Sequence, residues 1–294
     1  MTQSEHSHSA GPGVEAGALY VVATPIGNLR DITLRAIDVL KAVDAIAAED
    51  TRHSRTLLDH YGIGTRLFAV HEHNERTSAE RIIELLEAGK TVAMITDAGT
   101  PAISDPGAVV VEAVLAEGLC VIPIPGASAL ITALSASGTT ATGFTFAGFL
   151  PAKGGQRRTL LEEFVDRGQA LVFYEAPHRI VESLADVATV FGGERKVTIC
   201  RELTKRFESL HRCPAGDAVA WLEGDDNNRR GEFVVIVEGA SRDAESVDDG
   251  EARRVLGVLL EELPTKQAAA LGAKLTGLKK NELYEMALRL AEKK

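Results

Sequence analysis

Two short apolar segments near the middle of the chain each run directly into a loop of small residues. Residues 92–95 (VAMI) are followed by TDAGTP, and residues 120–124 (CVIPI) are followed by PGAS and an apolar helix. Short apolar runs that stop at Gly and Pro are typical of buried strands in a parallel sheet. Ligands bind at the carboxyl ends of such strands, where small residues let the backbone approach them. We therefore expect a small-molecule site here, with Asp97 and Ser128 as polar groups.

The same succession of strand, turn and helix recurs along the first half of the chain. Further strands are expected at residues 19–23, 45–48 and 68–70, and helices at residues 34–43 and 78–88, the second of them capped by Ser78. Repeated units of this kind build a parallel sheet covered by helices. Residues 18–147 are therefore predicted to form an α/β domain.

A segment rich in Pro, Gly and Lys at residues 150–155 marks the boundary to a second α/β domain, expected at residues 148–242. It is predicted to start with a helix at residues 156–167 and to contain a charged turn at 201–208. An acidic linker at residues 241–250 leads into a small helical domain at 248–294 with a helix-turn-helix pattern. Residues 1–17 are polar and aperiodic, so we expect a disordered tail there.

The composition is that of an ordinary globular protein. Charged residues make up 25% of the 294 residues and apolar residues 45%, and no apolar run approaches the roughly 20 residues that span a bilayer. We expect a cytoplasmic protein without membrane contact. The formal net charge of −10 confines any nucleic-acid contact to local basic surfaces, such as the Lys-rich segment from Lys266 onwards. Cys120, Cys200 and Cys213 are expected to be buried thiols rather than disulfides or zinc ligands.

Charged residues follow two other predicted strands of the first domain. Residues 49–55 (EDTRHSR) and 71–75 (HEHNE) place acids, imidazoles and guanidinium groups at strand ends. One interpretation is a catalytic site, and the other is a helix start with acids at its positive end. His71 and His73 could bind a metal, but no third ligand follows at a suitable spacing, so no metal site is predicted.

Several familiar motifs are missing from the sequence. It contains no phosphate-binding G-x-x-x-x-G-K-[ST] loop, no G-x-G-x-x-G turn after a strand and no G-x-S-x-G nucleophile elbow. A crevice lined by Pro, Gly, Ala and Ser with one carboxylate suits a neutral or cationic nucleoside-like ligand better than a polyphosphate. The residues alone indicate a small-molecule site but no particular reaction.

Six motifs in a fixed order carry a resemblance to a known family. They are ATPIGNL (23–29), EDTR (49–52), TDAGTP (96–101), PGASA (125–129), GFLP (148–151) and YEAPHR (174–179). The series resembles the tetrapyrrole-methylase superfamily, and more closely its branch that methylates the ribose 2′-hydroxyl of a cytidine in the decoding centre of 16S rRNA. The resemblance implies two α/β domains with S-adenosylmethionine in the cleft between them, a C-terminal helical domain and a homodimer. The turn TPIG replaces the glycine-rich G-x-G-x-G-D turn of the wider superfamily, which argues against a porphyrinoid substrate.

The resemblance also implies site residues, carried over position by position. The cofactor would contact Pro25, Ile26, Gly27, Asp97, Gly99, Thr100, Ala127, Ser128, Tyr174, Ala176 and Pro177. Because a ribose hydroxyl is a weak nucleophile, a base should help, and Glu49, Asp50, His71, His73 and Glu75 are all candidates. Among these we favour Glu49 and Asp50, oriented by Arg52. A positive rim for RNA phosphates would comprise Lys153, Arg157, Arg158, His178, Arg179, Lys205 and Arg206.

Three functions remain open. The first is an S-adenosylmethionine-dependent 2′-O-methyltransferase of 16S rRNA, with the assembled 30S subunit as the expected substrate. The second is a methyltransferase of the same fold that acts on a small molecule such as a tetrapyrrole. The third is a ribosome-binding factor that kept the fold and binds no cofactor.

Overall fold

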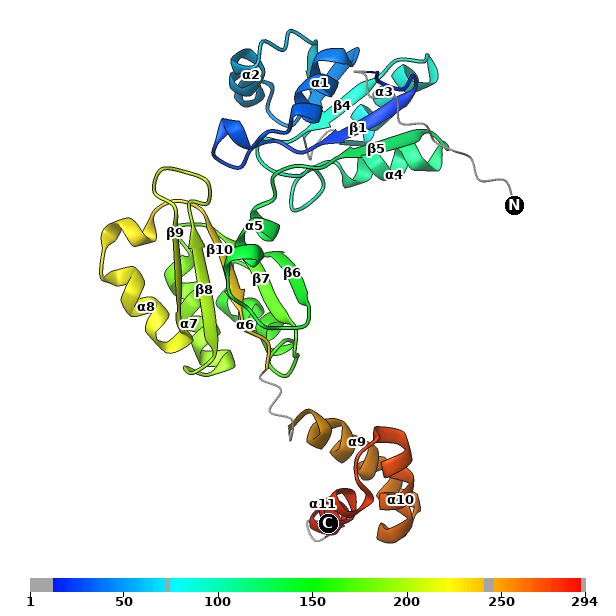
Figure 1. Cartoon of the computed structure of the whole chain (residues 1–294), viewed down its shortest axis with the longest axis vertical. Helices are drawn as coiled ribbons and strands as arrows, with labels where there is room; N and C mark the ends of the chain where they lie inside the picture. Colours follow the sequence, from blue (N-terminus) through cyan, green and yellow to red (C-terminus); the bar gives the residue numbers. More distant parts are fainter. Residues whose placement is uncertain (1–12, 72–74, 241–245, 292–294) are drawn as a thin grey trace. The chain divides into compact units, whose positions relative to one another are not determined.

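Two five-stranded sheets and a set of C-terminal helices make up the parts of the chain that are described (Figure 1). The computed structural model describes residues 13–71, 75–240 and 246–291. Both sheets belong to one unit, residues 1–239, and the C-terminal helices belong to a second unit, residues 240–294. Within the described ranges, no helix is long and apolar enough to cross a membrane.

The first sheet is wholly parallel and has the strand order β3-β2-β4-β1-β5. Its strands are β1 (Ala18–Val22), β2 (Ala45–Ala48), β3 (Leu67–Ala69), β4 (Val92–Ile95) and β5 (Cys120–Ile124). Parallel strands with helices on both faces are buried on both sides, which explains why β2 and β4 are entirely apolar. All five strands end at the same edge, so their following loops meet there.

Helices cover both faces of the first sheet. They are α1 (Leu34–Ala42), α2 (Thr51–His60), α3 (Glu75–Glu87) and α4 (Ala108–Ala116), with a short 3₁₀ helix η1 (Leu29–Asp31) before α1. Tyr20 packs in the cluster that α1 and α2 close, whereas its neighbour Leu19 packs in the cluster that α3 and α4 close. Successive strand residues point to opposite faces, so each strand contributes to both cores.

The second sheet is mixed, with the order β6-β7-β10-β8-β9 and only the β6–β7 pair parallel. Its strands are β6 (Phe144–Phe149), β7 (Ala170–Glu175), β8 (Lys196–Arg201), β9 (Ser209–Pro214) and β10 (Phe233–Val237). One face is covered by α6 (Gly154–Glu162), α7 (Ile180–Phe191) and α8 (Ala215–Glu223), and a 3₁₀ helix η3 (Asp226–Arg229) follows α8.

Helix α5 (Ala129–Ala136) links the two sheets. It begins directly after the loop that leaves β5, yet its Leu130 and Ala133 pack against Val172 and Val234 of the second sheet. The chain therefore passes from the carboxyl edge of the strands of the first sheet straight onto a face of the second. This brings the loops of both sheets to the same place.

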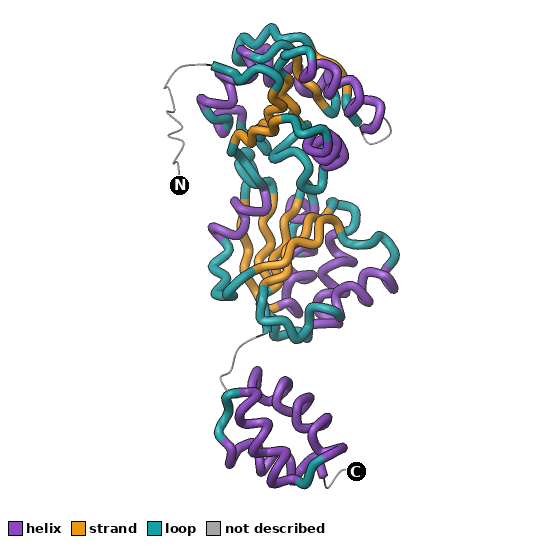
Figure 2. Tube along the Cα trace, turned by 90° about the vertical axis from the view of Figure 1, so that its right-hand side faces the viewer, coloured by secondary structure: helices purple, strands orange, loops and turns teal. Residues whose placement is uncertain are grey.

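The C-terminal unit consists of α9 (Ser246–Glu262), α10 (Thr265–Thr276) and α11 (Lys280–Ala291) (Figure 2). Its core contains Leu256 of α9, Ala268 and Ala269 of α10, and Leu283 of α11. Gly277 ends α10 in the left-handed conformation, as a C-terminal cap that favours glycine does.

The predicted α/β class with a small C-terminal helical part is confirmed, and several boundaries are corrected. The expected boundary between residues 147 and 148 falls inside β6, which belongs wholly to the second sheet. Helix α3 begins at Glu75, so Ser78 is a buried residue within it rather than its cap. The predicted helix at residues 156–167 begins at Gly154 and ends at Glu162. Of the disordered tail predicted at residues 1–17, residues 1–12 lie outside the described residues, but residues 13–17 are described, and the N–H of Glu15 donates to the hydroxyl oxygen of Tyr20 at 2.6 Å. Of the linker predicted at residues 241–250, residues 241–245 lie outside the described residues, and residues 246–250 are already helical.

One cysteine also differs from its prediction. Cys200 and Cys213 are buried, but Cys120 is exposed. The reason is that β5 pairs only with β1 and so forms an edge of the first sheet. A strand at an edge lacks a neighbour on one side, and its first residue is open to solvent.

Candidate active site

Backbone hydrogen bonds join the loops at the ends of the central strands. The N–H of Thr24 donates to the carbonyl oxygen of Gly99 at 2.8 Å, and the N–H of Gly99 donates back at 3.0 Å. The hydroxyl of Thr100 donates to the carbonyl oxygen of Ala127 at 3.1 Å. Gly99 has a φ of +84°, a conformation that favours glycine. The loops after β1, β4 and β5 thus form one platform.

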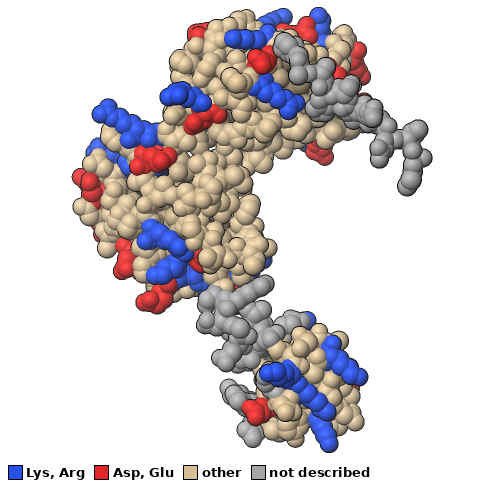
Figure 3. Space-filling view, in the orientation of Figure 1, with Lys and Arg blue, Asp and Glu red and all other residues tan. Residues whose placement is uncertain are grey.

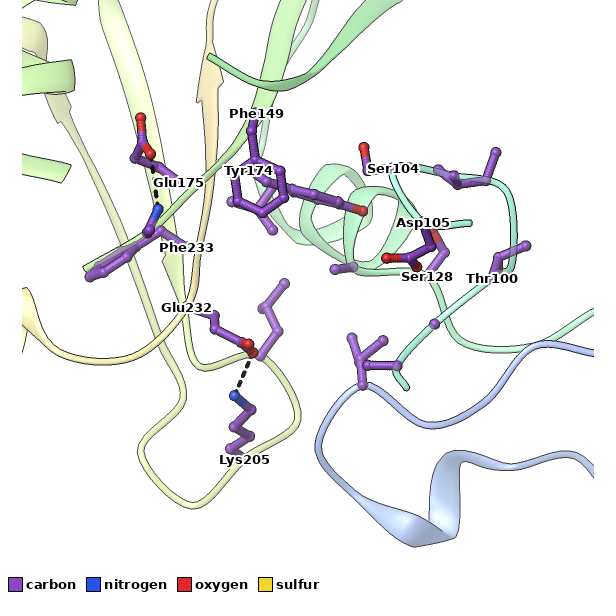
Figure 4. A pocket seen from close by; sticks show the side chains of 18 of the residues that line it. Thr100, Ser104, Asp105, Ser128, Phe149, Tyr174, Glu175, Lys205, Glu232 and Phe233 are labelled. Carbon is purple, nitrogen blue, oxygen red and sulfur yellow. Dashed lines mark hydrogen bonds and ion pairs between the residues drawn. The ribbon is translucent and has the colours of Figure 1, made fainter. Parts of the chain in front are cut away.

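A cavity of about 330 Å³ lies between this platform and the second sheet (Figure 4). From the first sheet and α5 it is lined by Ile26, Ala98, Gly99, Thr100, Ile103, Ser104, Asp105, Ser128 and Ala129, and from the second sheet by Phe149, Tyr174, Glu175, Ala176, Pro177, Leu203, Lys205, Glu232, Phe233 and Val234. We call it the first cavity. Its size and mixture of apolar walls with a few polar groups are typical of small-molecule sites.

Tyr174 is fixed at the wall of the first cavity from three sides. Its hydroxyl oxygen accepts a hydrogen bond of 3.2 Å from the N–H of Leu130 on α5. Its ring makes edge-to-face contacts with Phe146 and Phe149 at centroid distances of 4.8 and 5.7 Å. Burial raises the pKa of the phenol, which stays neutral at ordinary pH. Tyr174 therefore presents a rigid, neutral aromatic surface to a ligand.

Asp105 supplies a carboxyl group to the wall formed by the first sheet, which faces Tyr174 and Phe149 of the second sheet (Figure 4). Burial, together with the neighbouring charges of Glu49 and Asp97, raises the pKa of Asp105 to about 6. Burial also raises the pKa of Glu49, whose carboxylate accepts a hydrogen bond of 3.3 Å from the N–H of Asp97. Asp97 and Asp105 lie in the loop between β4 and α4, and Glu49 follows β2, so the three carboxyl groups create a negative potential that a cationic ligand would relieve.

A second cavity of about 490 Å³ lies on the other side of the turn after β1. It is lined by Pro25, Ile26, Gly27, Leu29, His53, Ser54, Thr56, Leu57, Thr96, Asp97, Ala98, Lys205 and Glu232. Most of these residues belong to the first sheet and to α2. Only Lys205 and Glu232 among them come from the second sheet.

Lys205 sits in a tightly held loop after β8. Its ammonium group lies 2.9 Å from a carboxylate oxygen of Glu202 and 2.7 Å from one of Glu232. Partial burial alone would lower the pKa of Lys205, but its hydrogen bonds to the two carboxylates outweigh this effect and raise the pKa. Arg201 fixes the same loop by donating to the carbonyl oxygens of Arg230 at 2.7 Å and Phe207 at 2.8 Å. Lys205 is therefore a positioned, charged group.

The residues predicted to bind the cofactor divide between the two cavities. Those that line the first cavity are Ile26, Gly99, Thr100, Ser128, Tyr174, Ala176 and Pro177, whereas Pro25, Gly27 and Asp97 line the second. Ala127 contributes its carbonyl oxygen to the hydrogen bond from Thr100. Sequence reasoning missed Asp105, because nothing in its loop reveals that the residue is partly buried and that Glu49, from the loop after β2, lies nearby.

The residues favoured as the base are placed differently from the prediction. The carboxylate of Asp50 caps α2, where it accepts from the N–H groups of Arg52 at 2.7 Å and His53 at 3.4 Å. The side chain of Arg52 is 92% exposed, and neither residue lines either cavity. Asp50 thus has the helix-capping role that was the alternative interpretation.

The remaining base candidates do not line the cavities, although Glu49 contacts Asp97, which lines the second one. Glu49 is held by the N–H of Asp97, and Glu75 accepts a hydrogen bond from the N–H of Gly107 at the start of α4. His71 is exposed, and His73 lies outside the described residues. None of the three described residues lines either cavity.

Only some of the residues predicted to form an RNA-binding rim are exposed. Lys153, Arg158, His178 and Arg206 are exposed. Arg157 is instead buried, with its Nε 2.7 Å from a carboxylate oxygen of Asp186. Arg179 donates to the carbonyl oxygen of Leu150 and lies 3.2 Å from the buried carboxylate of Glu175. Arg157 and Arg179 therefore hold the second sheet and its helices together, and their role as phosphate ligands stays a prediction.

Two family profiles together match most of the chain. Residues 18–219 match the family described as Tetrapyrrole (Corrin/Porphyrin) Methylases, and residues 246–291 match the RsmI C-terminal HTH domain. The chain belongs to the tetrapyrrole methylase family. Within that family, the second match and the curated relatives place it in the branch whose members are named ribosomal RNA small subunit methyltransferase I.

The relatives cover nearly the whole chain. The protein of that name from Pseudomonas aeruginosa is 52% identical over 278 residues, which are 94% of this chain and 98% of the relative. The protein from Escherichia coli O157:H7 is 50% identical over 272 residues, covering 92% and 95%. Among solved structures, a cobalt precorrin-4 methyltransferase has a TM-score of 0.55 at 16% identity, and the methyltransferase CobJ a TM-score of 0.57 at 18% identity. Each covers 76% of this chain and 95% of the other, and at this identity the likeness concerns the fold alone.

Proposed function

We propose that this chain is an S-adenosylmethionine-dependent methyltransferase that modifies the ribose 2′-hydroxyl of a cytidine in the decoding centre of 16S rRNA. The observation that carries the proposal is the 52% identity to a ribosomal RNA small subunit methyltransferase I, which extends over 94% of the chain. The alternative of a tetrapyrrole substrate has weaker support, because the solved tetrapyrrole enzymes are below 25% identical.

The first cavity fits the proposed cofactor. Tyr174, Phe149 and Ile26 offer apolar and aromatic surface to an adenosine group, and Thr100 and Ser128 offer hydroxyls. Asp105 places a carboxylate where a sulfonium cation would gain from it. When bound, S-adenosylmethionine supplies a methyl group that passes from sulfur to an oxygen nucleophile. The chain's own contribution is to hold that nucleophile in line and to accept its proton.

The proposed RNA contact rests on local basic surfaces. Lys153, Arg158, His178 and Arg206 are exposed on the first unit. On the C-terminal unit, Lys266, Lys274, Lys279 and Lys280 are exposed, and Figure 3 shows Lys and Arg side chains gathered on its visible face. Clustered cations bind phosphates by releasing condensed counterions, even on a protein of net negative charge.

The substrate and assembly state follow from the same proposal. We propose the assembled 30S subunit as substrate, which places the protein in the cytoplasm. We also propose a homodimer, as the family resemblance implies. Exposed apolar side chains such as Leu115, Ile131 and Phe144 offer surface for such an interface.

A comparison of acceptors tests the proposed function. Labelled S-adenosylmethionine would be incubated with the protein and either 30S subunits that lack the modification, naked 16S rRNA or a porphyrinoid. We expect methyl transfer to rRNA, with the 30S subunit preferred. Transfer to the porphyrinoid alone would favour the small-molecule alternative, and cofactor binding without transfer to any acceptor would contradict the proposal.

A further inference from the structure

The two cavities share a wall. Among the residues that the structure describes, Ile26, Ala98, Lys205 and Glu232 line both. Two of these are charged, and they form an ion pair of 2.7 Å, which Figure 4 shows at the edge of the first cavity. A group transferred from a molecule in one cavity to a molecule in the other must pass this wall.

The second cavity has the chemistry of a nucleoside site. Pro25, Leu29 and Leu57 provide apolar surface, and His53 and Asp97 provide groups that can form hydrogen bonds. Small apolar clefts with a few polar groups are what nucleoside-sized ligands require.

Ser54 gives an independent sign that this cavity takes a polar ligand. It lines the cavity, the residue is only 3% exposed, and its hydroxyl has no hydrogen-bond partner among the described residues. Buried polar atoms in native proteins are normally paired, and an unpaired one calls for an explanation. A ligand that bonds to the Ser54 hydroxyl supplies one.

We propose that the second cavity holds the acceptor nucleotide and that the Lys205–Glu232 pair holds its 2′-hydroxyl at the shared wall. This inference rests on the proposed function and names the residues that act on the acceptor. It replaces Glu49 and Asp50 as the base, and it gives Lys205 a role at the reacting oxygen instead of at an RNA phosphate.

The chemistry of the pair suits a ribose hydroxyl. The hydroxyl donates its proton to the carboxylate of Glu232, and the ammonium of Lys205 donates a hydrogen bond to the hydroxyl oxygen, which keeps a lone pair directed across the wall. That oxygen forms the new bond to the methyl carbon, and the electron pair of the broken carbon–sulfur bond stays on sulfur. Glu202, 2.9 Å from Lys205, keeps the ammonium in place.

A binding readout comes from photo-crosslinking. Thr56 is exposed and lines the second cavity, whereas His60 lies on the same helix and lines neither cavity. We would introduce benzoylphenylalanine as Thr56→benzoylphenylalanine, with His60→benzoylphenylalanine as the matched control, and irradiate each with 30S subunits. The first variant should crosslink to the methylated cytidine or its neighbours, and the control should not. Crosslinks at distant nucleotides would overturn the assignment of this cavity.

A kinetic readout tests the pair itself. Glu232→Gln should lower kcat by roughly 10²-fold or more, as loss of a general base does, which is a larger factor than any change in cofactor affinity measured by calorimetry. Glu223→Gln, an exposed residue at the end of α8, is the control and should retain full activity. Lys205→Arg should retain more activity than Lys205→Met, because the cation is kept.

The outcomes separate this inference from the function on which it rests. If the wild-type protein transfers no methyl group to rRNA, the proposed function fails. If the wild type is active and Glu232→Gln is equally active, only the inference fails. Ser54→Ala adds a further check: it should raise the KM for 30S subunits several-fold without lowering the melting temperature, because its hydroxyl has no partner in the described part of the chain. An unchanged KM would show that the ligand does not bond to the hydroxyl of Ser54.

Discussion

Gly27 and Lys205 approach so closely that residue 27 has no room for a side chain. A Cβ atom on Gly27 would lie 2.4 Å from Cγ of Lys205 and 3.1 Å from the hydroxyl oxygen of Thr204. Gly27 lies in the turn after β1, and Lys205 in the loop after β8, so this contact joins the two sheets beside the shared wall. The position of the Lys205 ammonium group therefore depends on the missing side chain of Gly27.

Gly27→Ala should displace Lys205 from Glu232. Two carbon atoms that are not bonded to each other cannot lie 2.4 Å apart, so either the side chain of Lys205 or the loop that carries it must shift. We expect at least a tenfold loss of kcat with little change in melting temperature, because Gly27 is exposed and not in a left-handed conformation. Gly64→Ala is the control, since a Cβ there meets no atom within 4 Å. Equal activity of the two variants would show that the contact does not position Lys205.

Asp105→Asn should remove the pH dependence of the affinity for the cofactor. The pKa of Asp105 is raised to about 6 by burial and by Glu49 and Asp97, against a weaker opposing hydrogen bond from Thr96. A cationic cofactor should bind more weakly as the pH falls through 6 and Asp105 gains a proton, and the variant should lose this dependence. Calorimetry between pH 5 and 8 measures both, and a wild-type affinity that does not change with pH would contradict the role of Asp105.

The same substitution should stabilise the protein without ligand. A carboxyl group whose pKa is raised on folding stabilises the folded state at low pH. This stabilisation is lost as the pH rises through the pKa that the group has in the folded protein. At pH 8 we expect Asp105→Asn to increase the free energy of unfolding by about 1 kcal/mol, because solvent screens a half-buried group. The gain should shrink towards pH 4 in denaturant titrations. A loss of stability at pH 8 would contradict this electrostatic account.

Arg157→Ala should act on stability rather than on RNA binding. Removal of one partner of a buried ion pair leaves the other charge uncompensated, which costs roughly 3 kcal/mol or more. Arg158→Ala is the control, because Arg158 also contacts Asp186, at 2.9 Å, but is 46% exposed. An exposed pair contributes only about 0–1 kcal/mol. If Arg157→Ala instead raised the KM for 30S subunits at unchanged melting temperature, the original prediction of an RNA contact would stand.

Removal of residues 240–294 should weaken RNA binding and spare the cofactor. These residues form a separate unit with its own core, and both cavities lie in the first unit. Loss of the exposed lysines should reduce affinity for 30S subunits and flatten its dependence on salt. Calorimetry with S-adenosylmethionine and filter binding at two ionic strengths give both values. A parallel loss of cofactor affinity would show that the C-terminal unit supports the first unit.

The parallel sheet could be predicted because its strands are short apolar runs that stop at small residues. Other elements carry no such signal. Helix α4 (AVVVEAVLA) is nearly all apolar and so has no helical periodicity, and β9 alternates exposed and partly buried residues on a sheet edge. Both were missed for these reasons.

The candidate site was predictable only where its residues lie in the loops themselves. Arg157 and Arg158 are neighbours with the same side chain, and only the direction of helix α6 decides that one is buried and the other exposed. Asp105 owes its raised pKa first to burial and then to the charges of Glu49 and Asp97, and neither its burial nor the approach of Glu49 can be read from the local sequence. The role proposed for Glu232 depends on its ion pair with Lys205, and the two residues meet only when the second sheet folds.

The most direct test of the account is the identity of the methylated nucleoside. 16S rRNA from 30S subunits treated with the protein and labelled S-adenosylmethionine would be digested to nucleosides for mass spectrometry and, in parallel, mapped by cleavage that ribose methylation blocks. The account predicts a single 2′-O-methylcytidine in the decoding region, absent with Glu232→Gln. A methyl group on a base, or on a ribose elsewhere, would contradict it.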